Sequence, residues 1–330
     1  MSAAMRSASA GKAGSSPLRE AAIGTAWGLL VVLIWAVWVV STRVGVKTSL
    51  RPIDIMLVRY ICASAVLVPL CLRRGMPLVA ANWRATALLV AGAGAPFLFV
   101  SATGMKYAPA SHIASVMIGS MPFFVAVLSL LVMRERLRRA QAVGFALLLA
   151  GLAIFGLFDS SDGIQGEWRG HALFLLAALM WAVYTIVLRR QGLGALHAAG
   201  VVNGWSLALV LIVYAGVGHP DFAAVQWRDL GYQAIAQTLS AVVGLYAYGE
   251  SVRRLGAARA SVLGALTPAV ATILAFLFLG ERPSALTIVA IALVTAGVMC
   301  ASRKPGERGS EIARPHLPRE FLRRAFPDDA

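Results

Sequence analysis

The sequence has few of the residues that form the surface of a water-soluble protein. Only 14% of its 330 residues are Asp, Glu, Lys or Arg, whereas 59% are hydrophobic and the mean hydropathy is +0.75. Soluble domains are about 45–50% apolar, so this excess is too large for an ordinary core. The composition therefore excludes an ordinary soluble enzyme or binding domain.

Cysteine is scarce, and the motifs of metal and catalytic sites are absent from the sequence. Cys62, Cys71 and Cys300 have no metal-binding or redox spacing and lie in apolar runs, so we interpret them as small packing residues. The sequence contains no His-Glu-x-x-His zinc pair and no Gly-x-Ser-x-Gly nucleophile motif. We therefore expect no enzyme, no bound metal and no cofactor.

Apolar runs long enough to cross a membrane recur along the chain. A transmembrane helix needs about 20 apolar residues. We identify ten such runs, at 23–41, 54–72, 85–105, 109–133, 137–158, 169–188, 196–218, 229–250, 255–279 and 284–301. No soluble domain fits between them, so we predict an all-α polytopic membrane protein with ten transmembrane helices in the lipid bilayer.

Acidic residues are half as numerous as basic ones, 15 against 30, which gives a formal net charge of +15. Such a charge can indicate nucleic-acid binding, but the position of the basic residues argues against that partner. Most of them fall in the tails and in every second loop, where the positive-inside rule expects the cytoplasm. We predict a multi-pass protein of the cell (inner) membrane with both termini cytoplasmic.

An internal repeat divides the chain into two similar halves. The phrase IWAVW at Ile34–Trp38 returns 146 residues later as MWAVY at Met180–Tyr184. The same offset relates further identical pairs: Pro122 and Pro268, Glu135 and Glu281, Gly151 and Gly297. A constant offset indicates duplication. Because each copy has five spans, an odd number, the second copy must enter the membrane inverted.

The inverted repeats predict the domain organisation. We place the two five-helix repeats at 23–158 and 167–302, and cytoplasmic tails at 1–22 and 303–330. Many secondary transporters are built from inverted repeats, with the substrate site at the interface between them. We therefore expect a central cavity between the repeats.

Three sets of residues carry a resemblance to a known family: the W-A-V-W/Y phrase of each half, KYAPASHIASVMIGSMPFFVAVLSLLVMRERL at Lys106–Leu137, and RLGAARASVLGALTPAVATILAFLFLGERP at Arg254–Pro283. With these motifs the sequence resembles the EamA-type, ten-helix branch of the drug/metabolite transporter superfamily over roughly residues 24–302. The resemblance implies export or exchange of amino acids, metabolites or drugs by alternating access. Small four-helix relatives depend on a glutamate in their first span, which residues 23–41 lack, so a facilitator or exchanger is at least as well supported as a proton antiporter.

Aromatic residues deep in two spans are the first candidates for the cavity wall. Trp35 and Trp181 lie near the membrane midplane, where the interfacial preference of tryptophan does not explain them. Trp38 and Tyr184 follow three residues later on the same helix faces. Helix packing is the alternative role of these four residues. Tyr246 is a weaker cavity candidate, as are the polar Asn203, Gln237 and Thr238.

Prolines within spans predict helix kinks, which transporters use to expose backbone groups near a substrate site. The candidates are Pro96, Pro122 and Pro268. A kink needed only for shape is the alternative.

Ionisable residues inside spans are functional candidates by default. Arg59 is a candidate ligand for a substrate carboxylate, but it could equally reach the interface or pair with Asp54. His112 and Glu250 are the possible coupling residues, with a structural role as the alternative for each. The sequence therefore predicts an exporter or facilitator of small metabolites, such as amino acids or drug-like amphipathic molecules. A channel-like pathway and a proton-coupled antiporter are the alternatives.

Overall fold

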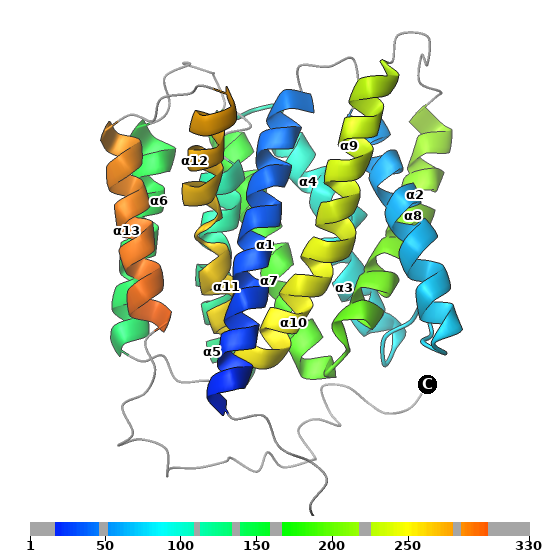
Figure 1. The fold of residues 1–330 in the computed structure, drawn as a ribbon, viewed down its shortest axis with the longest axis horizontal. Helices are drawn as coiled ribbons and strands as arrows, with labels where there is room; N and C mark the ends of the chain where they lie inside the picture. Colours follow the sequence, from blue (N-terminus) through cyan, green and yellow to red (C-terminus); the bar gives the residue numbers. More distant parts are fainter. Residues whose placement is uncertain are drawn as a thin grey trace, which may run out of the picture.

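The computed structural model describes residues 17–45, 52–108, 113–133, 139–158, 167–217, 226–279 and 285–302. Within these ranges the chain is helical apart from short turns, and it forms no strand. The helices lie side by side and roughly parallel (Figure 1).

The first repeat contains five spans, two of which are divided into shorter segments. Its helices are α1 (Pro17–Gly45), α2 (Pro52–Arg73), α3 (Trp83–Ala93), α4 (Ala95–Gly104), the π-helix η1 (Ile113–Ile118), α5 (Gly119–Met133) and α6 (Arg139–Phe158). The third span consists of α3 and α4, and the fourth consists of η1 and α5.

The second repeat has the same plan. Its helices are α7 (Glu167–Gln191), α8 (Ala195–Val217), α9 (Trp227–Leu239), the π-helix η3 (Ser240–Gly244), α10 (Leu245–Leu255), α11 (Ala257–Gly264), α12 (Thr267–Leu279) and α13 (Ala285–Ser302). The eighth span consists of α9, η3 and α10, and the ninth consists of α11 and α12. The predicted ten spans are confirmed, and several begin or end a few residues beyond the predicted limits.

Length and composition fit a bilayer. Seven of the described helices are long and apolar enough to cross a membrane: Leu18–Ser41, Ile53–Arg73, Trp83–Gly104, Val116–Met133, Trp168–Gln191, Ala195–Gly216 and Ala257–Phe278. Shorter apolar helices at Arg139–Gly151 and Ile288–Gly297 belong to α6 and α13. Many large apolar side chains on the outer faces are exposed, such as Phe99 and Ile212, as expected for residues that contact lipid.

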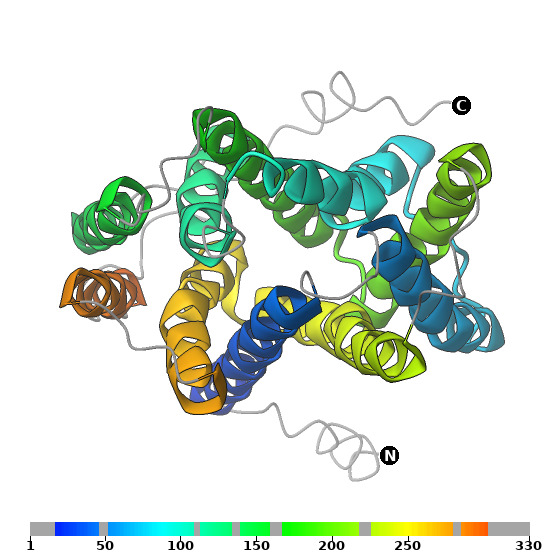
Figure 2. The same cartoon turned by 90° about the horizontal axis from the view of Figure 1, so that it is seen from above.

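Equivalent spans of the two repeats meet in pairs. Helix α6 packs along α13, and α2 packs along α8. Figure 2 shows the first pair at one edge of the molecule and the second pair at the opposite edge. Likewise, α1 packs against α10, α11 and α12, while α7 packs against α3, α4 and α5. This two-fold pattern of contacts confirms the architecture of two inverted repeats.

The α6–α13 contact shows the symmetry residue by residue. A Cβ atom added to Gly151 would lie 2.9 Å from the carbonyl oxygen of Ala290, and one added to Gly297 would lie 2.7 Å from that of Gly144. Both distances are shorter than side chains tolerate, so each glycine allows the partner backbone to approach closely. The repeated glycines of the sequence therefore serve one shared interface.

Two spans are broken, and a proline lies within a third. Gly94 separates α3 from α4, and its extended backbone (φ −101°, ψ −151°) ends the first helix. Pro96 follows in the first turn of α4, where its missing N–H is not needed. A turn at Ala265 and Leu266 separates α11 from α12, with Pro268 in the first turn of α12. Pro122 instead lies within α5, just after η1.

Candidate functional site

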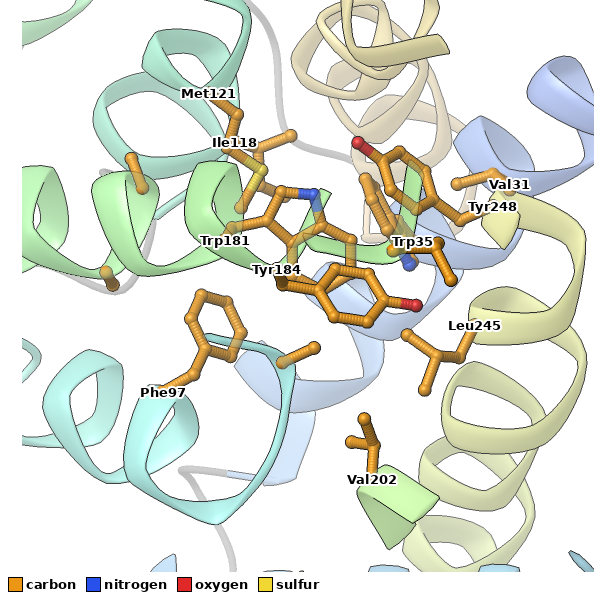
Figure 3. Close-up of a cluster of buried hydrophobic side chains, with 14 of the residues drawn as sticks. Val31, Trp35, Phe97, Ile118, Met121, Trp181, Tyr184, Val202, Leu245 and Tyr248 are labelled. Atoms are coloured by element: carbon orange, nitrogen blue, oxygen red, sulfur yellow. The ribbon is translucent and has the colours of Figure 1, made fainter. Parts of the chain in front are cut away.

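Four aromatic rings from both repeats meet at the centre of the molecule. Trp35 of α1 and Trp181 of α7 contact each other edge to face, with ring centroids 5.1 Å apart and an interplanar angle of 82°. Tyr248 of α10 lies 5.6 Å from Trp35 and 5.0 Å from Trp181. Tyr184, one turn after Trp181, lies 5.2 Å from it. Figure 3 shows these rings converging from different helices.

Hydrogen bonds fix part of this aromatic cluster. The hydroxyl groups of Tyr248 and Thr185 lie 2.8 Å apart, and the Thr185 hydroxyl also donates to the carbonyl oxygen of Trp181 at 2.9 Å. The cluster is thus anchored to the backbone of α7 at its most buried side. Among the described residues, the buried Tyr184 hydroxyl has no hydrogen-bond partner.

A cavity lies against the cluster, between the two repeats. It contains about 450 Å³ of space free of protein atoms, part of it open to solvent. The lining residues come from both repeats and are mostly apolar: Trp35, Trp38, Arg59, Ala93, Phe97, Leu98, Met117, Ile118, Met121, Trp181, Ser240 and Leu245. A central cavity between the repeats was predicted, and the structure contains one.

Irregular helix geometry is concentrated around this cavity. Met117 and Ile118 belong to η1 and Ser240 belongs to η3, so each repeat lines the cavity with part of a π-helix. Gly244 of η3 allows Ile34, the neighbour of Trp35, to approach, because a Cβ atom there would lie 3.2 Å from Cγ2 of Ile34. π-Helical segments occur frequently at functional sites.

One part of the cavity wall is polar. The indole N–H of Trp38 donates to Oε1 of Gln237 at 2.9 Å. Arg59 of α2 donates from Nη1 to the same oxygen at 3.1 Å and to the backbone oxygen of Gln237 at 3.4 Å. The first and second repeats are therefore joined by hydrogen bonds through the Gln237 amide.

The sequence candidates fall into different places. Trp35, Trp38, Trp181 and Arg59 line the cavity, and Tyr184 belongs to the adjoining aromatic cluster.

Tyr246 is not among the lining residues. Its ring packs edge to face on Trp27, with centroids 5.6 Å apart. His112 lies outside the described residues.

Glu250 belongs to an ion cluster away from the cavity lining. Its carboxylate accepts hydrogen bonds from Arg253 at 2.7 and 3.1 Å and from Arg254 at 3.2 Å. Arg254 also binds Glu20, in the first turn of α1. The cluster therefore joins the start of α1 to the end of α10.

Some lining residues were not singled out from the sequence. Phe97 and Met117 are two of them, and Tyr248 of the adjoining aromatic cluster was missed as well. In the sequence all three resemble ordinary residues of an apolar span, and only a correct helix phase would have pointed them inward. No group of three or more His, Cys, Asp or Glu in the described part of the chain is arranged to hold a metal ion. What the site offers chemically is an aromatic surface beside one cationic, hydrogen-bonding wall.

Comparisons with known proteins agree with this architecture. The sequence profile of the EamA-like transporter family matches residues 22–157 and again residues 168–303. A solved crystal structure superposes with a TM-score of 0.67 at 22% identity, covering 84% of this chain and 96% of that one. At that identity the similarity shows the fold alone.

Several curated relatives have names that describe export. A “Probable terminal-alkyne amino-acid exporter” of Streptantibioticus cattleyicolor is 28% identical over 64% of this chain and 70% of its own length. A “Probable amino-acid metabolite efflux pump” of Salmonella typhimurium is 23% identical over 82% of this chain and 91% of its own. A threonine/homoserine exporter of the same species is 29% identical over 45% of this chain and 51% of its own.

Proposed function

The chain belongs to the EamA-like transporter family, and from this premise we propose that it exports an amino acid or a similar small amphipathic metabolite through the cavity between its repeats. The family and the membrane-spanning fold make it a transporter. The class of substrate and the outward direction are the proposal.

The observation that carries the proposal is the composition of the cavity wall. Trp35 and Trp181 come from equivalent positions of the inverted repeats, and with Phe97 they offer an aromatic surface to the apolar part of a molecule. Arg59, held by Gln237, offers a positive charge and hydrogen-bond donors on another side. An amphipathic molecule matches both parts of the wall. The names of the relatives support the same class of substrate.

Alternating access gives the repeats a mechanism. The break at Gly94, together with η1 and η3, lies within spans that line the cavity, and the break at Ala265–Leu266 lies in the ninth span, which packs against α1 and η1. Such breaks provide points at which parts of a span change angle while α6–α13 and α2–α8 keep the repeats together. Rocking of one repeat against the other around a fixed site is the usual form of this mechanism.

We propose a facilitator or exchanger in the cell membrane with both termini in the cytoplasm. Among the described residues, no Asp or Glu lines the cavity, and a proton-driven carrier needs an ionisable group exposed alternately to both sides. The distribution of basic residues supports the orientation of the termini. A channel-like pathway is the alternative, which the counterflow test below distinguishes.

Counterflow in proteoliposomes tests the proposal. Vesicles with the purified protein are loaded with a mixture of unlabelled amino acids, and the entry of each labelled amino acid is followed. We expect saturable entry of at least one amino acid that rises transiently above equilibrium, because a carrier exchanges internal for external substrate. Vesicles without protein give the background. No carrier-dependent entry of any amino acid refutes the substrate class, and unsaturable entry without exchange supports a channel.

A further inference from the structure

The geometry points to Arg59 as the residue that binds the carboxylate of the transported molecule, with Gln237 as the residue that positions it. This inference rests on the proposed function, since it assigns the charged group of the substrate to one side of the cavity described above. It also predicts which molecules the transporter rejects.

Arg59 has only neutral partners in the described part of the chain. Its Nη1 donates to the side-chain and backbone oxygens of Gln237, and its guanidinium carbon lies 5.9 Å from the centroid of the Tyr60 ring. The structure gives it no ion pair with a described carboxylate, Asp54 of the same helix included. A charge within a membrane protein is costly unless an opposite charge or many hydrogen bonds compensate it.

Arg59 also retains unused capacity to donate hydrogen bonds. A guanidinium group has five N–H donors, and the contacts of Arg59 use Nη1 alone. Its Nε is fully buried without a hydrogen-bond partner, and the side chain lines the cavity. A ligand carboxylate would supply both the missing charge and the missing acceptors, because it matches the fork of guanidinium donors.

Gln237 is held so that its oxygen faces Arg59. Its Oε1 accepts from both Trp38 and Arg59, while its Nε2 donates to Oε1 of Gln233 at 3.3 Å. Gln233 is fixed in turn, because its Nε2 donates to the backbone oxygen of Ser41 at 3.0 Å. Rotation of the Gln237 amide would turn its N–H groups toward two donors. The network therefore places a neutral acceptor, Oε1 of Gln237, on one side of the Arg59 guanidinium.

The aromatic wall of the cavity favours a carboxylate that belongs to a larger molecule over a free inorganic anion. Trp35, Phe97 and Trp181 line the cavity beside Arg59. An inorganic ion such as chloride has no apolar part that could pack on these rings. A carboxylate at Arg59 leaves the remainder of the molecule against these rings. Chloride shares the charge of a carboxylate, so the experiment includes it.

Binding measurements with matched acids and esters test the inference. Tryptophan fluorescence reports binding directly, since three tryptophans line the cavity. The probes are leucine, threonine and phenylalanine, each compared with its methyl ester, which keeps the amine and side chain but lacks the negative charge. We expect the wild-type protein to prefer each acid that it binds over the ester. A hydrogen bond to a charged group is worth roughly 10- to 100-fold in affinity.

Three variants separate binding from structure. Arg59→Gln should lower the affinity for the acids roughly 10- to 100-fold and leave that for the esters nearly unchanged, and Arg59→Lys should restore part of the difference. Gln237→Glu places a carboxylate where Arg59 already has an acceptor, so it should also weaken the acids selectively. Arg84→Gln, which removes an exposed arginine stacked on Trp83, is the control and should change neither affinity.

The outcomes that overturn the inference differ from a failure of the proposed function. Equal affinity of the wild type for acids and esters, or an equal loss of both in Arg59→Gln, would assign Arg59 a structural role. Chloride is added to the wild-type protein as a competitor. Competition by chloride together with equal affinities for acid and ester would show that the site binds chloride rather than a substrate carboxylate. The absence of amino-acid counterflow by the wild-type protein, in contrast, refutes the proposed function itself.

Discussion

Trp35 and Trp181, which occupy equivalent positions of the two repeats, contact each other edge to face across the interface between those repeats. The relationship explains why the phrase around each tryptophan is repeated in the sequence. Two copies of one segment, inverted with respect to each other, bring the same side chain to one central place. Changes at these two residues should therefore have similar effects.

Trp35→Phe and Trp181→Phe should each weaken the binding of a transported amino acid. Both rings are more than nine-tenths buried, so the smaller aromatic is preferable to alanine, which would open a large void. Lost aromatic contact is worth about 0.5–1.5 kcal/mol, roughly 2- to 10-fold in affinity. Trp83→Phe, on a side chain that is 71% exposed, is the control. Unchanged affinity in both cavity variants would assign these rings to packing.

Gly94→Ala should destabilise the break between α3 and α4. A Cβ atom there would lie 2.3 Å from Oγ of Ser206 and 2.4 Å from the carbonyl oxygen of Val90, and overpacking of this kind costs about 1–3 kcal/mol. Gly216→Ala is the matched control, because nothing lies within 4 Å of its Cβ position. Thermal unfolding in detergent should show a lower midpoint for Gly94→Ala alone. Equal midpoints would contradict the close packing of the break.

The architecture was predictable from the sequence because its signals are long and repeated. Apolar runs of membrane length define the spans, and a constant offset between identical residues defines the duplication. The same offset placed Trp35 and Trp181 in equivalent positions. Inversion followed from the odd number of spans, without knowledge of any contact.

The helix phase in the eighth span was not predictable. Tyr246 was selected as a cavity candidate, but it packs on Trp27, whereas Tyr248 belongs to the central cluster. Residues that are two positions apart on a helix point to nearly opposite faces. The π-helix η3 lies just before both tyrosines, and its wider turn shifts the phase that regular periodicity would give. The hydrogen bonds between Arg59 and Gln237 also join residues 178 positions apart, which no local pattern reveals.

Glu250→Gln should leave most transport activity intact. Glu250 binds Arg253 and Arg254 in the ion cluster and does not line the cavity, so we expect its loss to affect stability more than proton coupling. Uptake into proteoliposomes, measured with and without an imposed pH gradient, should differ little in the wild type. Accumulation above equilibrium that requires the gradient and is abolished in Glu250→Gln would identify a proton-coupled carrier instead.

Cysteine labelling tests the proposed orientation. Arg74 follows α2 and Gln226 precedes α9, and both residues are exposed. With Cys62, Cys71 and Cys300 replaced, Arg74→Cys should react with a membrane-impermeant thiol reagent only after the cells are opened. Gln226→Cys should react in intact cells. The reverse pattern at either residue would contradict both the orientation and the positive-inside argument.

The most direct test of the account asks whether substrate occupies the cavity between the repeats. Leu98 lines that cavity, while its neighbour Phe99 is 59% exposed on the outer surface, so Leu98→Cys and Phe99→Cys form a matched pair in a protein without other cysteines. The rate of modification by a charged, water-soluble thiol reagent is measured in proteoliposomes, with and without the amino acid that counterflow identifies. We predict that Leu98→Cys reacts, that modification blocks counterflow, and that the amino acid slows the reaction, whereas Phe99→Cys remains unmodified and active. Full modification of Leu98→Cys with undiminished counterflow, or a rate that the amino acid does not change, would contradict transport through this cavity.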